Sequence, residues 1–298
     1  MFGLNYQKPG KGIEKRAENA PRIPIFFEVL FRKLWNFCKI NVLYLIVSLP
    51  VIAILVAISG VVSVPLTEAI KPALSNVLGD LNSSDQASMI SSMVWFDMLV
   101  RFVVTVLFIV FLGMGPATAG LTYILRNYAR EEHAWIWSDF WRNLWSNFRQ
   151  SVLVLVIDVL VCLVLGTAIK FYFNMGGAGL ILVPITLSVA VVYLMMHLYI
   201  YQLMVTFKLS IASLFKNSFA FAVANLPKNL LLLAILAIVH IVVPIVCMMA
   251  GKGILIFALL EVLVLIVASG FFTNFFVYPT TEKYIKMVGQ NTAAESRE

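Results

Sequence analysis

Six uninterrupted apolar runs constrain this chain more than any other feature of its sequence. A helix needs about 20 apolar residues to cross the hydrocarbon core of a bilayer. The chain is 61% hydrophobic and 12% charged, which is more apolar material than a water-soluble core absorbs. The sequence therefore predicts six membrane spans, at 39–61, 93–114, 151–173, 179–206, 229–250 and 253–278.

The character of the runs decides between helices and strands. Leucine, isoleucine, valine and phenylalanine follow one another without the two-residue alternation of a membrane β-barrel. Unpaired backbone is costly in hydrocarbon, so a continuous apolar run satisfies its amides as a helix. The expected fold class is all-α, a polytopic membrane helix bundle.

The 22 lysines and arginines predict the orientation of these spans. Eight precede the first span, four lie between spans two and three, three lie between spans four and five, and three follow span six. The opposite side carries three, and Arg101 lies within a span. Cytoplasmic loops are enriched in basic residues, so both termini are expected in the cytoplasm. The net charge of +7 is then an orientation signal, and since no nucleic-acid-binding motif occurs, no nucleic acid is expected as a partner.

This topology divides the chain into three parts. A basic cytoplasmic tail with an amphipathic helix is expected at 1–38, a single membrane domain at 39–280, and a second cytoplasmic tail at 281–298. Within the membrane domain we expect an external segment at 62–92 and cytoplasmic helices at 116–150 and 208–228.

The stretch DFWRNLWSNF, residues 139–148, is rich in aromatic rings immediately before a span. Written as a helix, it places its rings at spacings of three and four, on one face. Tryptophan favours the headgroup level of a membrane and arginine meets anionic lipid there, which favours an interfacial helix on an anionic inner leaflet. The alternative is an ordinary helix buried against its neighbours.

A similar pattern, FRKLWNFCKINVLYLIV, begins at Phe31. The residues predicted for this lipid or partner surface are Trp35, Phe37, Trp137, Phe140, Trp141, Arg142, Trp145, Phe148 and Arg149.

Ionisable groups inside the spans are candidates for function, since charge in a membrane is expensive and faces the interior of a bundle. These residues are Asp97, Arg101, Asp158, His197, His240 and Glu261. Asp97 and Arg101 are spaced to pair on one helix face. Counting along the helices places Arg101 and Glu261 at one depth, and Asp158 and His197 at another. The groups form either a polar pathway for a proton or solute, or structural contacts between helices.

The sequence contains no motif of known catalysis. It has no phosphate-binding Walker loop, no His-Glu-x-x-His and no Gly-x-Ser-x-Gly. No nucleophile–base pair is evident, so we expect no enzyme activity, no catalytic or metal-ligating residues and no cofactor.

The segment GPATAGLTYILRNYAREEHAWIWSDFWRNLWSNFRQS, residues 115–151, resembles the signature region of the YesL-like membrane proteins, a family of unknown biochemical function. Gly115 and Pro116 form its signature turn, and NVLYLIVSLPV at 41–51 resembles the first span of the family. Typical members pass almost directly from Leu-Pro to Gly-Pro-Ala-Thr-Ala, whereas about 60 residues intervene here.

The resemblance also implies a cellular location and a functional association. Genes of this family commonly sit beside carbohydrate ABC importers in Gram-positive bacteria, which implies a multi-pass protein of the bacterial cytoplasmic membrane linked to sugar uptake by association. We therefore expect a non-catalytic accessory or regulatory membrane protein, with importer subunits as partners. The alternative is a secondary transporter or permease subunit that uses the intramembrane charges. The sequence leaves the oligomeric state open.

Overall fold

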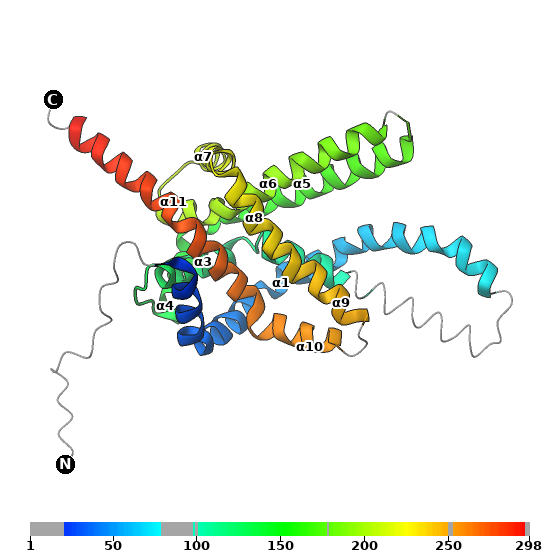
Figure 1. Cartoon of the computed structure of the whole chain (residues 1–298), viewed down its shortest axis with the longest axis horizontal. Helices are drawn as coiled ribbons and strands as arrows, with labels where there is room; N and C mark the ends of the chain where they lie inside the picture. The colour runs from blue at the N-terminus through cyan, green and yellow to red at the C-terminus, as the bar shows by residue number, and fades with distance from the viewer. Residues whose placement is uncertain (1–20, 79–97, 99–100, 178, 250–252, 296–298) are drawn as a thin grey trace, which may run out of the picture.

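The computed structural model describes residues 21–78, 98, 101–177, 179–249 and 253–295, and these residues contain helices and no strands (Figure 1). The chain is an all-α polytopic bundle and a multi-pass membrane protein. Its helices are α1 (Arg22–Leu78), an unlabelled helix Arg101–Phe111, α3 (Pro116–Ala129), α4 (Ile136–Ser146), α5 (Phe148–Met175), α6 (Gly179–Thr206), α7 (Ile211–Ala224), α8 (Leu226–Ala237), the π-helix η1 (Ile238–Val242), α9 (Val243–Met249), α10 (Gly253–Leu260), the π-helix η2 (Glu261–Leu265) and α11 (Ile266–Glu295).

Five stretches of helix are long and apolar enough to cross a bilayer, and a broken pair supplies a sixth. The five are Arg22–Ala57, Phe148–Met175, Gly179–Thr206, Leu226–Cys247 and Gly253–Tyr284. The sixth consists of Arg101–Phe111 and Pro116–Ala129, which bend by 55° at the residues between them. Residues 62–78 of the predicted external segment continue helix α1, and residues 79–92 lie outside the described residues. Which side of the membrane each end faces stays a prediction.

Helix α3 lies at the centre of the bundle, where the sequence analysis expected a cytoplasmic helix at 116–150. It packs against α1, α4, α5, α6 and α11, and its residues Ile124, Leu125 and Tyr128 are buried. The turn at Gly115 and Pro116 joins two half-helices that form either one broken span or a re-entrant segment, and α3 is the buried second half. The cytoplasmic placement of this segment stays a prediction.

The bend between the two half-helices depends on two glycines and a threonine. Gly113 and Gly115 have φ values of +90° and +58°, a conformation that residues with a Cβ rarely adopt. Thr118 Oγ1 accepts a hydrogen bond from the Met114 backbone N–H at 2.6 Å and lies 2.9 Å from the Tyr44 hydroxyl of α1. The backbone that leaves the helix is thereby held by protein rather than lipid.

Helix α1 begins at Arg22 and runs without interruption through the predicted boundary at 38 and 39. The amphipathic stretch and the first span are therefore one helix. Arg32 near its start forms a salt bridge of 3.1 Å with Glu131, in the connection between α3 and α4. This contact fixes the start of α1 beside α4.

Helices α5 and α6 form a pair that projects away from the rest of the bundle (Figure 1). Large apolar side chains are exposed along both, among them Val164, Phe171 and Ile181. A contiguous apolar surface of this extent is stable only against a non-aqueous phase. The exposed pair therefore indicates contact with lipid.

Candidate functional site

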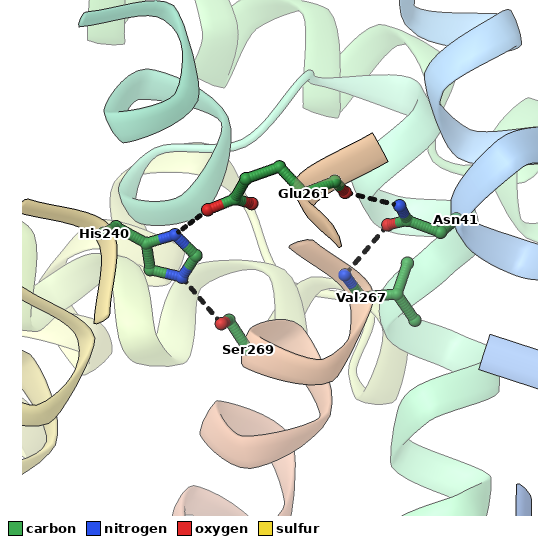
Figure 2. A network of polar contacts seen from close by, with 5 residues as sticks. All are labelled: Asn41, His240, Glu261, Val267 and Ser269. Carbon is green, nitrogen blue, oxygen red and sulfur yellow. Dashed lines mark hydrogen bonds and ion pairs between the residues drawn. The ribbon is translucent and has the colours of Figure 1, made fainter. Parts of the chain in front are cut away.

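Two buried pairs of histidine and carboxylate form the candidate site. The first joins η1, η2 and α11 (Figure 2). His240 Nδ1 lies 2.7 Å from Glu261 Oε1, and His240 Nε2 lies 2.7 Å from Ser269 Oγ. Both members of the pair are 1% exposed. Both ring nitrogens of this histidine thus have hydrogen-bonding partners.

Both pair members lie within π-helices, which are rare and frequently mark functional sites. The wider turn leaves backbone groups out of register, and the side chain of Asn41 in α1 bonds three of them. Its Nδ2 donates to the carbonyls of Glu261 and Val262 at 2.8 and 2.7 Å, and its Oδ1 accepts from the Val267 N–H at 3.0 Å. Figure 2 shows Asn41 and His240 on opposite sides of Glu261. The asparagine therefore stabilises the distortion that brings Glu261 to His240.

The second pair joins α5 and α6. His197 Nε2 lies 2.8 Å from Asp158 Oδ1, and the Tyr193 hydroxyl donates to the same oxygen at 2.6 Å. Both pair members are buried. Asp158 Oδ2 and both ring nitrogens of His197 are buried without a hydrogen bond in the described part of the chain, so the 2.8 Å contact between Nε2 and Asp158 lacks hydrogen-bond geometry. This pair is therefore less completely bonded than the first.

A polar cavity of about 70 Å³ lies at the break between the two half-helices. Residues 109–113, at the end of the first half, line one side of it. The side chains of His197, Tyr201 and Asn274 also line it, and each carries a buried polar atom without a hydrogen bond in the described residues. The remaining polar lining comes from Tyr44, Thr118, Thr122, Gln202 and Thr273.

A larger hollow, of about 320 Å³, lies between α1, Arg101–Phe111 and the start of α11. Its lining is apolar apart from Arg101, Thr105 and Glu261. Arg101 and Glu261, which the sequence analysis placed at the same depth in the membrane, thus line the same hollow. Asp97 and its predicted pairing with Arg101 lie outside the described residues.

Part of the predicted aromatic surface is exposed in the structure. Trp35, Trp137 and Trp145 are between 63 and 71% exposed, and Phe148, Arg142 and Arg149 are exposed as well. Trp141 is half-buried. Phe37 and Phe140 are fully buried, so they do not belong to this surface. Phe37 packs on Tyr128 and Phe271, and Phe140 lies against Gly120 of α3, because α1 and α4 turn one face toward the core.

Comparison with known proteins gives one match. Residues 93–169 match the model of a family described as "Protein of unknown function, DUF624". The match covers the signature turn, α3, α4 and most of α5. It supports membership of an uncharacterised family of membrane proteins. No curated protein and no solved structure matches the chain.

Several contacts of the site were not predicted from the sequence. The pairing of His240 with Glu261 could have been found by counting back from the turn near Gly251, since the two residues lie about equally far from it. The roles of Asn41, Ser269 and Tyr193 carry no such signal, because neutral polar residues are common in spans.

Ser269, His240 and Glu261 have the connectivity of a serine–histidine–acid triad, a nucleophile–base contact that the sequence did not reveal. Acyl transfer also requires substrate access to the serine hydroxyl and donors for an oxyanion. Neither hollow described above is lined by Ser269. In the described residues, no group of three His, Cys, Asp or Glu side chains could hold a metal ion.

Proposed function

We propose that this chain is a non-catalytic accessory or regulatory subunit of the bacterial cytoplasmic membrane, whose partner is a carbohydrate ABC importer. The observation that carries the proposal is the exposed aromatic face of α1 and α4, with Trp35, Trp137 and Trp145 at its centre. Aromatic side chains are enriched at protein interfaces. A salt bridge of 3.1 Å joins Arg32 of α1 to Glu131, in the connection that leads into α4.

The choice of partner rests on family resemblance. The signature region at 115–151 resembles the YesL-like proteins, and the matched family model covers the same region. The link of that family to carbohydrate importers of Gram-positive bacteria is one of association. The buried pairs of the bundle are consistent with a subunit that holds its own shape while its inner face meets the partner.

Co-purification from native membranes tests this proposal. Wild-type protein is expected to enrich importer subunits, and the double variant Trp137→Ala/Trp145→Ala is expected to lose them, since central aromatic anchors carry most of the binding energy of an interface. The matched control is Phe171→Ala/Phe173→Ala, which removes two exposed rings at the far end of α5. Recovery of wild-type protein without importer subunits, or equal enrichment by both variants, counts against the proposal.

A second candidate is a secondary transporter, and the broken span favours it. Transporters commonly build their substrate sites from discontinuous helices near the bilayer midplane. Here the break lines a cavity with polar walls beside the contact between His197 and Asp158. Reconstituted protein would then move a solute across a vesicle membrane, and Asp158→Asn together with His197→Gln would stop it. Flux that survives both substitutions would remove this candidate.

A further inference from the structure

The cavity at the break offers hydrogen-bond acceptors, together with the hydroxyl of Tyr201, which can accept or donate, to whatever occupies it. Asn274 uses its Nδ2 to donate to the Gly270 carbonyl at 2.8 Å, which leaves Oδ1 as the buried atom without a hydrogen bond. An amide oxygen only accepts. The end of the first half-helix adds further acceptors, because the last carbonyls of a helix lack partners within it.

The tautomer of His197 makes its free nitrogen an acceptor too. Nε2 lies 2.8 Å from a carboxylate oxygen of Asp158, outside hydrogen-bond geometry, and two lone pairs at that distance would repel. We therefore place the ring proton on Nε2, so that in the neutral ring Nδ1 presents a lone pair. This nitrogen is buried without a hydrogen bond, and His197 lines the cavity.

The charges around the cavity favour a positive occupant. No lysine, arginine, aspartate or glutamate is among the residues that line it, all of which are described. The carboxylate of Asp158 lies 2.8 Å from Nε2 of His197, which lines the cavity. The negative end of the dipole of helix Arg101–Phe111 also faces the break. The opposing N-terminus of α3 presents one donor fewer, because Pro116 has no N–H.

The size of the cavity limits the occupant further. A water molecule occupies about 30 Å³ of the liquid, and a cavity of about 150 Å³ holds benzene. A volume of about 70 Å³ therefore admits a species of one or a few heavy atoms.

We propose that this cavity binds a monovalent cation of about the size of water that donates hydrogen bonds, either ammonium or a proton carried on water or on His197. The acceptors of His197, Asn274 and the broken helix bind the donors, and Asp158 balances the charge. The titratable groups that face this site are Asp158, Tyr193, Tyr201 and Tyr44. The inference does not depend on the importer partner, because the isolated chain contains the whole site.

Thermal unfolding of the full chain in lipid nanodiscs tests the proposal. Ammonium chloride at constant pH is expected to raise the unfolding temperature with saturation, since a ligand that binds the folded state stabilises it. Sodium chloride and tetramethylammonium chloride at equal ionic strength are expected not to do so. Sodium lacks donors, and tetramethylammonium lacks donors and exceeds the cavity. An equal response to all three salts would overturn the inference.

Substitutions test whether the ammonium response arises at this cavity, and whether the bound cation is ammonium or a proton. Asn274→Leu is expected to weaken the apparent ammonium affinity at least about ten-fold, the effect of one lost hydrogen bond to a charged group. Asn274→Asp keeps the shape, adds a negative charge and is expected to strengthen it. His240→Gln is the matched control and keeps the wild-type response. If acidification alone stabilises the protein in a manner that requires His197 and Asn274, the cation is a proton. The absence of any response to ammonium and to acidification, or unchanged affinity in both Asn274 variants, would overturn the proposal.

Discussion

The two buried histidine–carboxylate pairs contain the same chemical groups and differ in what surrounds them. His240 has both ring nitrogens bonded, and the π-helices that position the pair are held by Asn41. His197 has one nitrogen beside Asp158, while the other lies free of hydrogen bonds in a residue that lines a polar cavity. Glu261 Oε2 is the one carboxylate or imidazole atom of the first pair that is buried without a hydrogen bond in the described residues, against three such atoms in the second pair. A more completely satisfied buried network rigidifies a structure. The comparison assigns stability to the pair at His240 and ligand binding to the pair at His197.

The largest effect is expected at Asn41. Asn41→Leu removes three buried hydrogen bonds to the backbone of η2 and α11, so we expect a loss of about 3–5 kcal/mol in the free energy of unfolding. Asn174→Leu, at an exposed position near the end of α5, is the matched control and should change it by less than about 0.5 kcal/mol. The measurement is reversible unfolding in mixed micelles. Equal effects of the two substitutions would show that the π-helices need no support from α1.

We expect the stability of the region around His197 and Asp158 to depend on the backbone conformation at Gly113, in the break between the two half-helices. Gly113→Ala places a Cβ 2.7 Å from Thr118 Oγ1 at a φ of +90°, so we expect a loss of about 2–3 kcal/mol in the same assay. Gly166→Ala serves as the control, because a Cβ at that position in α5 meets nothing within 4 Å and alanine favours helix. A neutral Gly113→Ala would contradict the description of the break.

Double-mutant cycles compare the two pairs directly. We expect the coupling between His240 and Glu261 to exceed that between His197 and Asp158 by about 1 kcal/mol. The reason is that Asp158 keeps the hydroxyl of Tyr193 when His197 is replaced, whereas the carboxylate of Glu261 loses its hydrogen bond to His240. A larger coupling at His197 would reverse the assignment of the two roles.

The smallest effect is expected at Ser269. Ser269→Ala should reduce the free energy of unfolding by about 0.6 kcal/mol, the average for a hydrogen bond between membrane helices. It should leave the ammonium response unchanged, since Ser269 does not line the cavity. A Ser269→Ala variant that lost this response would join the two pairs into one site.

Much of the fold could be predicted from the sequence, because burial in lipid leaves a direct signal in composition. The apolar runs predicted the spans, and counting along the helices placed Asp158 and His197 at one depth and Arg101 and Glu261 at another; the structure brings the members of each pair close together. The sequence analysis ended the second span at Gly115 and Pro116, whereas in the structure these residues join two half-helices bent by 55°. Glycine and proline also end helices, and whether a helix ends or bends there depends on packing partners far along the chain.

The side chains that complete the site could not be predicted, and the reason is physical. Asn41 bonds backbone groups 220 or more residues away, and nothing in its local sequence distinguishes it from other polar residues in a span. Phe37 and Phe140 were assigned to the surface because an amphipathic helix in a membrane has rings on both its lipid face and its core face. Periodicity identifies a face but does not say which medium covers it.

The most direct test of this account is nitrogen-15 NMR of the imidazole rings in lipid nanodiscs, because the chain has only three histidines. Single substitutions of His133, His197 and His240 assign the signals. The account predicts that added ammonium shifts the signal of His197 with saturation and leaves that of His240 in place, with exposed His133 as the reference. A shift at His240 with none at His197 would contradict it.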